Sequence, residues 1–201
     1  VISELRKNFQ IEELNAPEEI PSTIDVLLLV HPTGLSEETQ RAIDQFVLRG
    51  GRLLAFLDPM SVIAARDNPQ GRFSQPQGSD LGALLDAWGV SYEVEKVVTD
   101  DVNQSKLAGR NGQPQDYPAF LDLSPEFISE DHPAVSQLER ILIPFGGSFG
   151  MPKDAGGALE QTVLVRTSEK AGTVDAFMAQ MPPEQLTKNI KAVGGERALV
   201  V

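Results

Sequence analysis

Ile24-Asp25-Val26-Leu27-Leu28-Leu29-Val30-His31-Pro32-Thr33-Gly34-Leu35-Ser36, continued as far as Asp58-Pro59, is the stretch that decides the expected fold. Its apolar run, Val26–Val30, is typical of a strand that is covered on both faces. Ser36 then stands at an N-cap position, and apolar residues at helical spacing follow as far as Gly50-Gly51, where the helix is expected to end. A second apolar run covers residues 53–57. The stretch therefore predicts a strand–helix–strand unit with parallel strands and a right-handed crossover.

Segments of the same kinds flank this unit. We expect a helix end over residues 2–8, a short strand over residues 9–14, and a helix that Ser79 caps and Gly89 ends. Apolar patterns predict strands over residues 90–94, 141–145, 162–165 and 198–201, and the polar residues 100–118 predict a surface loop. Because strands and helices alternate, the expected fold class is α/β, a three-layer sandwich with a mainly parallel sheet. We expect one domain over residues 1–201.

The composition narrows the classes of function. The 201 residues carry 17 basic and 29 acidic side chains, which gives a formal net charge of −12. This charge argues against nucleic acid and against an anionic membrane surface as direct partners, because both require clustered Lys and Arg. The absence of cysteine excludes disulfides, thiolate nucleophiles and cysteine-ligated zinc. No run of residues is long and apolar enough to cross a membrane, so any membrane anchor is expected outside this chain.

One short motif resembles the nucleophile elbow of serine hydrolases. Gly146-Gly147-Ser148-Phe149-Gly150 fits the pattern G-x-S-x-G and follows a predicted strand. The elbow also requires a helix directly after it and a histidine later in the chain. Residues 151–157 have loop composition, and both histidines, His31 and His132, precede Ser148. A glycine-rich bend after a strand is therefore the favoured interpretation.

Metal and cofactor motifs are also incomplete. Asp101, Asn103 and Ser105 have the opening spacing of a calcium loop, but Lys106 occupies the position where glycine is required. Two histidines and no cysteine make a transition-metal site an unfavoured interpretation. Neither a P-loop nor a G-x-G-x-x-G stretch occurs. We therefore expect no cofactor and no metal.

His31 and Asp58 are the candidate ligand-binding residues. Each follows one of the two strands that are expected to run parallel, and ligands of open α/β sheets bind at the carboxyl ends of such strands. Each also stands beside a proline, Pro32 or Pro59, so both side chains have an alternative role in fixing a turn. Turn fixation is the favoured interpretation, and binding of a hydroxyl-bearing ligand is the alternative. No nucleophile accompanies the pair in the sequence.

Residues 24–36, 42–51 and 56–59 together resemble a known family. The stretch D-V-L-L-L-V-H-P-T-G-L-S, followed by A-I-D-Q-F-V-L-R-G-G and F-L-D-P, is similar to the extracytoplasmic domain of ABC-transporter auxiliary proteins related to the gliding-motility component GldG. Weaker matches follow in the right order over residues 2–9, 138–149 and 164–168. The layout is also similar to class I glutamine-amidotransferase-like domains that have lost their catalytic cysteine, which agrees with a chain without cysteine.

The resemblance implies a fold, a function and a set of partners. The implied fold is flavodoxin-like or class I glutamine-amidotransferase-like, without the strand that usually comes first. The implied function is that of a non-catalytic interaction or ligand-sensing module, extracytoplasmic or periplasmic, in a longer membrane-anchored protein. Its implied partners are an ABC permease and ATPase, with a glycan as a further expected ligand. The alternatives are an amidotransferase-like or hydrolase enzyme and a solute-binding protein.

Overall fold

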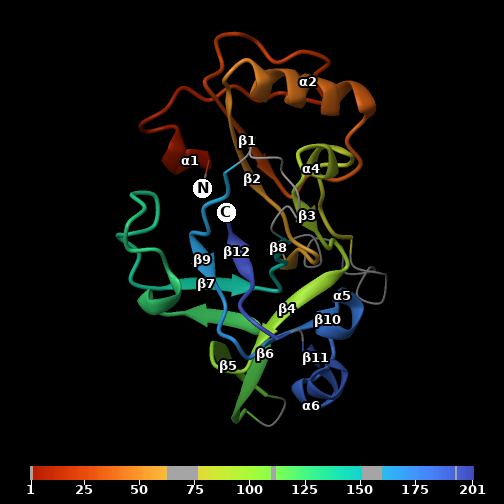
Figure 1. Cartoon of the computed structure of the whole chain (residues 1–201), viewed down its shortest axis with the longest axis vertical. Helices are drawn as coiled ribbons and strands as arrows, with labels where there is room; N and C mark the ends of the chain where they lie inside the picture. Colours follow the sequence, from red (N-terminus) through yellow and green to blue (C-terminus); the bar gives the residue numbers. More distant parts are fainter. Residues whose placement is uncertain (1, 63–76, 110–111, 151–159, 193) are drawn as a thin grey trace.

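The strand–helix–strand unit predicted over residues 24–58 is present in the computed structural model, which describes residues 2–62, 77–109, 112–150, 160–192 and 194–201. The unit consists of β1 (Val26–Val30), α2 (Glu37–Leu48) and β2 (Arg52–Phe56), and its strands pair in parallel from Val26–Arg52 to Val30–Phe56. The Ser36 hydroxyl accepts a 3.2 Å hydrogen bond from the Thr39 amide, as expected of an N-cap residue. Figure 1 shows this unit at one end of the molecule.

Helix α2 covers one face of the β1–β2 sheet. Phe46 is fully buried there, and its ring lies so close to Gly51 that a Cβ at that glycine would come within 2.4 Å of it. The core of this unit also includes residues from the segment before β1, from β1, from α2 and from the chain after β2: Ile20, Leu27, Ala42, Ile43, Leu81 and Leu84. Because side chains alternate along a strand, the neighbouring positions of β1 and β2 point away from α2.

The face of the sheet that points away from α2 is apolar and exposed. Parallel pairing places Val26 of β1 beside Arg52 of β2 on this face. The next two pairs along the face, Leu28–Leu54 and Val30–Phe56, are wholly apolar. Four apolar side chains of this face are exposed by half or more: Val26 at 52%, Val30 at 64%, Leu54 at 50% and Phe56 at 57%. We refer to Val26, Leu28, Val30, Leu54 and Phe56 as the open face. Parallel strands are normally covered on both faces, so this arrangement is unusual.

The remaining sheets are antiparallel, and the predicted fold class is therefore wrong. They have the strand orders β11-β10-β4, β3-β8-β12-β9 and β5-β6-β7, and the strand pairs described within them are antiparallel. Their strands are β3 (Ser91–Tyr92), β4 (Lys96–Asp100), β5 (Gln104–Ala108), β6 (Pro114–Leu123), β7 (Ile141–Pro144), β8 (Phe149–Gly150), β9 (Val165–Arg166), β10 (Ala171–Asp175), β11 (Lys191–Ala192) and β12 (Ala198–Val200).

The scarcity of helices that could connect parallel strands explains why most of the sheets are antiparallel. A parallel pair needs a connection of a dozen or more residues, usually a helix, whereas antiparallel strands need only a turn. The described helices other than α2 have four residues each and are α1 (Ile2–Leu5), α4 (Leu84–Ala87), α5 (Ala176–Ala179) and α6 (Pro183–Leu186), beside the short 3-10 turns η2 (Pro125–Phe127) and η3 (Thr187–Asn189). The chain is thus mixed α/β with mostly antiparallel sheets, and neither a flavodoxin-like nor an amidotransferase-like sandwich.

The structure contradicts some of the predicted helices, strands and loops and confirms others. The expected polar loop over residues 100–118 is largely the β5–β6 hairpin, and the expected helix from Ser79 to Gly89 is reduced to α4. Residues 9–14 form no strand, and residues 2–8 contain only the short helix α1. The strands predicted over residues 141–145 and 198–201 are confirmed as β7 and β12, and those over residues 90–94 and 162–165 in part, as β3 and the start of β9.

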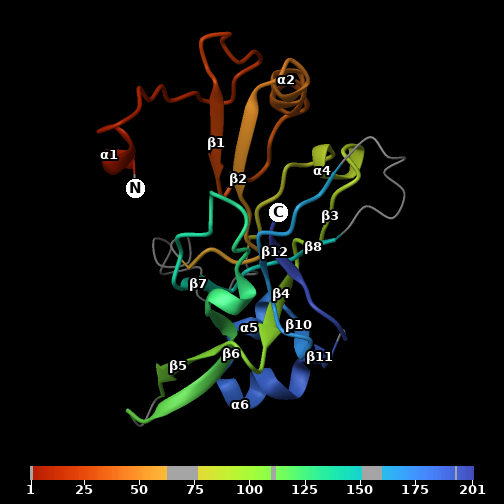
Figure 2. The ribbon, with the colours of Figure 1, turned by 60° about the vertical axis from the view of Figure 1, so that its left-hand side comes forward.

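Two further hydrophobic cores lie under the antiparallel sheets. One joins β4, β6 and β10 to α5 and α6, and the other joins β4 and β6 to β9 and β12. Their fully buried members include Val97, Val98, Leu121, Leu123 and Leu186. Strand β4 contributes to both cores with adjacent residues, since its side chains alternate between the two faces. Figure 2 shows this antiparallel region beneath the β1–α2–β2 unit.

Candidate functional site

The structure brings the two candidate residues together at the carboxyl ends of β1 and β2. The imidazole Nδ1 of His31 lies in hydrogen-bond contact with Oδ1 of Asp58, and both side chains are partly buried. Because a carboxylate only accepts, Nδ1 is the protonated ring nitrogen in this contact. The His31 backbone has a φ of 50° and its amide donates to the Phe56 carbonyl at 2.9 Å. The predicted proximity of the two residues is therefore present, and their role in ligand binding stays a prediction.

Ser79 is a third member of this cluster that sequence reasoning assigned to a different role. Its hydroxyl accepts from the Asp58 amide at 2.8 Å and lies 3.3 Å from Oδ1 of Asp58, and its amide donates to the Asp58 carbonyl at 2.9 Å. The residue is fully buried. The sequence predicts that Ser79 caps a helix, but α4 begins only at Leu84. Nothing in the local sequence links Ser79 to Asp58, because the contact spans 21 positions.

The three side chains do not form a hydrolytic triad. In a triad the serine hydroxyl is hydrogen-bonded to the imidazole, which takes up its proton. Here Ser79 binds the carboxylate and backbone of Asp58, and it is too deeply buried to meet a substrate. The cluster instead holds the segments after β1 and β2 together, and the amide of Asp80 adds a 3.2 Å hydrogen bond to the Pro32 carbonyl. This geometry supports turn fixation, the favoured interpretation of the pair.

Tyr92 lies close to the same cluster. Its hydroxyl is buried and has no hydrogen-bond partner among the described residues. Burial raises the pKa of Tyr92, and the negative charges of Asp58 and Asp80 raise it further. The ring stacks on Phe149 with centroids 5.2 Å apart, and a Cβ at Gly147 would lie 2.6 Å from it. This close packing explains glycine at position 147, which is a variable position of the G-x-S-x-G pattern.

A cavity of about 500 Å³ opens next to Ser79. It is lined by Gln77, Gly78, Asp80, Val94, Glu95, Asp175, Ala176 and Phe177. Asp175 forms an ion pair with Lys96, and their hydrogen bond raises the pKa of Lys96 and lowers that of Asp175. Asp80 and Glu95 add further negative charge to the lining. The cavity is therefore unsuited to an anionic ligand.

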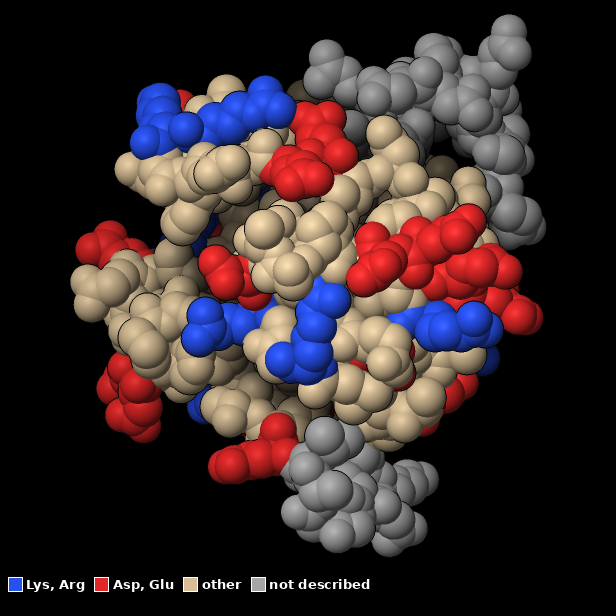
Figure 3. Space-filling view, turned by 90° about the horizontal axis from the view of Figure 1, so that it is seen from above, with Lys and Arg blue, Asp and Glu red and all other residues tan. Residues whose placement is uncertain are grey.

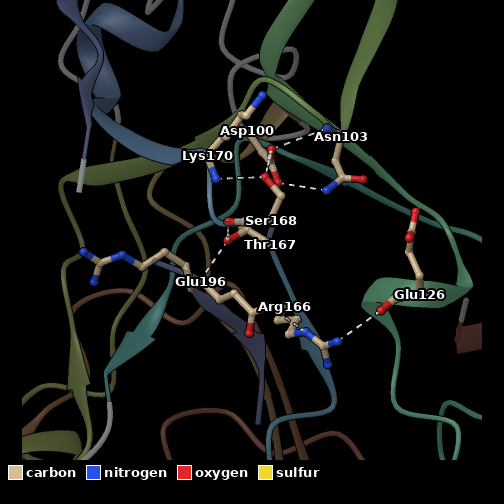
Figure 4. A network of polar contacts seen from close by, with 9 residues as sticks. Asp100, Asn103, Glu126, Arg166, Thr167, Ser168, Lys170 and Glu196 are labelled. Atoms are coloured by element: carbon tan, nitrogen blue, oxygen red, sulfur yellow. Dashed lines mark hydrogen bonds and ion pairs between the residues drawn. The ribbon is translucent and has the colours of Figure 1, made fainter. Parts of the chain in front are cut away.

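A separate polar network surrounds Asp100, which ends β4 and is completely buried (Figure 4). Its carboxylate accepts from the Ser168 amide and hydroxyl, both at 2.7 Å, from the Asn103 side chain at 2.8 Å and from the Val102 amide at 2.9 Å. Burial acts to raise the pKa of Asp100, but these hydrogen bonds outweigh it and hold the pKa below 3.8. Because donors from the same chain satisfy the Asp100 carboxylate, we interpret the network as structural.

The candidate calcium loop is part of this network. Asn103 and the backbone around Asp101 turn the chain from β4 into β5, and the Asp101 carbonyl accepts from the Gln104 side chain at 3.0 Å. Within the described ranges, no group of three or more His, Asp or Glu side chains is placed to hold a metal ion. The helices that the structure describes are also all too short or too polar to span a membrane.

The surface carries both signs of charge. Figure 3 looks onto the end of the molecule that holds α2, and it shows basic and acidic groups interspersed with uncharged ones. Exposed ion pairs such as Arg6–Glu13 and Arg166–Glu196 contribute to this mixture.

Comparison with known families gives the class of the protein. A family model described as an ABC-type uncharacterized transport system, which represents an auxiliary component, matches residues 1–201. The chain belongs to this family. No curated protein and no solved structure matches it. As an ABC transport auxiliary component, it is associated with a transporter, and its family does not point to an enzyme.

Proposed function

We propose that this auxiliary component is a non-catalytic interaction module that binds the permease subunit of its transport system through the open face. We further propose that it does so on the extracytoplasmic side of the membrane, in a system of the gliding-motility type that also contains the ATPase. The resemblance of residues 20–59 to auxiliary proteins of such systems supports these finer assignments. The structural observation that carries the proposal is the exposure of the open face.

The open face has the properties of a protein-binding surface. Its five apolar side chains are contiguous, and contiguous exposed apolar patches mark interaction sites, whereas scattered exposed residues are normal. A stable interface between two copies takes roughly 20–30 residues from each. Five residues are too few for that, but they suit one amphipathic segment of a partner. Arg52, at the end of the face, favours a partner segment with an acidic residue at that position.

The alternatives have less support. Ser79 contacts Asp58 rather than His31, so the cluster lacks the proton-transfer geometry that a hydrolase requires. The amidotransferase-like alternative loses its basis, because the predicted sandwich is absent. Glycan binding was implied by analogy with that sandwich and loses the same support. A solute-binding protein needs a deep cleft between lobes, and the acidic cavity beside Ser79 is the observation that favours this alternative.

A binding assay with purified permease tests the proposal. The full chain and the permease subunit, held in lipid nanodiscs, are compared by biolayer interferometry. The double variant Val30→Ser/Leu54→Ser should weaken the Kd at least tenfold, because two apolar contacts are lost, each worth roughly 1 kcal/mol. Leu48→Ser is the matched control, since Leu48 is 71% exposed on α2 and lies outside the open face.

The control should bind within about twofold of the wild type, because substitution of an isolated exposed side chain is close to neutral. Equal binding by the double variant and the control would show that the permease contacts another surface. Absence of wild-type binding would contradict the choice of partner. Circular dichroism of all three proteins should coincide, so that any loss of binding reports the surface and not the fold.

A further inference from the structure

The pairing of β1 with β2 determines which backbone groups of β1 point away from the sheet. The His31 amide donates to the Phe56 carbonyl at 2.9 Å, and the Arg52 amide donates to the Asp25 carbonyl at 3.2 Å. Successive residues of a strand direct their N–H and C=O groups to opposite sides, so the odd-numbered residues of β1 bind β2. The residues that direct these groups outward are Val26, Leu28 and Val30.

These outward groups form a free edge of the sheet. Among the hydrogen bonds that the structure describes, none involves the backbone N–H or C=O of Val26, Leu28 or Val30. Figure 2 shows β1 at the border of its two-stranded sheet, with β2 on its other side. The side chains of the same three residues belong to the open face, and those of Val26 and Val30 are more than half exposed. The free edge and the open face are therefore one continuous surface.

The edge strands of the antiparallel sheets differ from β1. Strands β3, β9 and β11 have two residues each, and β4 is bonded on its outer side, where the Val98 amide donates to the Gly146 carbonyl at 2.8 Å. Strand β5 contains Lys106 and a shift of register after Gln104, and β7 ends in Pro144. Short edges, lysines, prolines and bulges all prevent an edge strand from pairing with another chain.

Strand β1 has none of these features. Its five residues, Val26–Val30, are all aliphatic, and their register with β2 is continuous. Strand β2 begins with the charged Arg52, and the residues that direct its backbone groups away from β1 pack against the first core: Leu53, Ala55 and Leu57. Strand β1 is therefore the edge best suited to accept a further strand.

We propose that an extended segment of the partner adds to this sheet as a third strand beside β1, with its backbone bonded to Val26, Leu28 and Val30. The identity of the partner rests on the proposed function, whereas the mode of binding is a further inference. The free groups recur at every second residue, roughly 7 Å apart. An extended chain presents complementary groups at this spacing, whereas a helix bonds its own backbone internally.

The surroundings of the edge define the chemistry of the added segment. On one side of the sheet its side chains lie next to the open face and extend it. On the other side they lie next to Leu27 and Leu29, which pack in the core beneath α2. Both rows favour apolar side chains, and β-branched residues suit a strand. The partner segment is therefore extended, about five residues long, uncharged and rich in valine and isoleucine.

Hydrogen exchange at single amides of the full chain tests the proposal, with mass spectrometry and electron-transfer fragmentation as the readout. Permease in nanodiscs should slow exchange at the Leu28 and Val30 amides at least tenfold, because both become bonded to the added strand. The Leu27 and Leu29 amides already bond to β2 and should change far less. A synthetic peptide of alternating valine and threonine, with a lysine at each end, is the partner-free probe and should protect the same two amides at millimolar concentration.

Leu28→Pro tests the backbone contact directly. Proline removes an N–H that points away from β2, so it leaves the β1–β2 ladder intact. Leu28→Ala is the matched control, because it also loses the leucine side chain but keeps the N–H. The proline variant should bind the permease at least tenfold more weakly than the alanine variant. If circular dichroism shows that Leu28→Pro does not fold, replacement of the Leu28 amide by an ester removes the same N–H and keeps the side chain, and should weaken binding several-fold.

The outcomes separate this inference from the proposed function. Permease binding without protection of the Leu28 and Val30 amides would overturn strand addition and leave the proposed function standing. Protection by the peptide without any binding of the permease would support strand addition and contradict the choice of partner. Protection by neither would overturn both. Protection that rises with the concentration of the protein alone would overturn the partner as occupant and assign the edge to a second copy of the chain.

Discussion

The β1–α2–β2 unit and the antiparallel region are stabilised by contacts of different range. In the first, the decisive contacts are close in sequence: Ser36 caps α2 through Thr39, and the Gly50-Gly51 pair ends it. In the second, the Asp100 carboxylate binds Ser168, 68 positions away. The two regions also have separate cores, one around Phe46 and two under the antiparallel sheets.

This difference separates what a sequence can predict from what it cannot. An N-cap and a C-terminal glycine can be recognised within a few residues, but a pairing partner 68 positions away has no local signature. We therefore expect the two regions to unfold in response to different substitutions. The first should open when its single core is weakened, while the second should depend on polar contacts between distant segments. Three substitutions test these expectations, from the largest effect to the smallest.

Phe46→Ala should have the largest effect. Phe46 is fully buried and fills the space between α2 and the sheet, so its truncation should lower the free energy of unfolding by about 4 kcal/mol. Urea denaturation measures the loss. Hydrogen exchange shows where it acts: amides of α2 should lose protection, while the β4–β10 ladder should keep it.

A uniform loss of protection in Phe46→Ala would contradict the division into two regions, since it would mean that the cores unfold as one cooperative unit. Phe46→Leu is the graded control. It keeps an apolar side chain at the site, so it should cost considerably less than the alanine variant while affecting the same amides.

Asp100→Asn should have the second largest effect. The neutral amide accepts fewer hydrogen bonds than the carboxylate and adds donors that face the donors of Ser168 and Val102. The expected loss is about 2 kcal/mol at neutral pH, measured by urea denaturation. In hydrogen exchange, amides on both sides of the contact should lose protection, namely those in the turn after β4 and in the segment before β10.

The pH dependence of this variant provides a separate test. The pKa of Asp100 is lower in the folded chain than its ordinary value of 3.8, so its contribution to stability is present above about pH 4. The contribution is lost as the pH falls from there toward the lowered pKa. Between pH 5 and pH 3 the wild type should therefore lose more stability than Asp100→Asn. Parallel pH profiles would show that the carboxylate is not ionised preferentially in the folded state.

The sequence predicted the parts of the fold that depend on local signals. The apolar runs of β1 and β2 and the caps of α2 were sufficient to define the parallel unit and to place His31 beside Asp58. The antiparallel hairpin was not predicted because β5, β6 and the turn between them have the Gln-, Asn- and Gly-rich composition of a loop, and the pairing of the two strands with each other decides their conformation. Ser79 was misassigned because its helix-capping pattern competes with a contact to Asp58 that only the folded chain reveals.

Ser36→Ala should have the smallest effect of the three, and it tests the local side of the comparison. Removal of the hydroxyl that accepts from the Thr39 amide should cost about 1 kcal/mol, and Ser36→Asp should restore most of it, because aspartate also caps and its charge suits the helix N-terminus. Urea denaturation measures both variants. If the loss instead spread to the protection of β4 and β10, the cap would be coupled to the distant region. A loss confined to the first turn of α2 would show that this unit is stabilised from within its own sequence, which is the reason that it could be predicted.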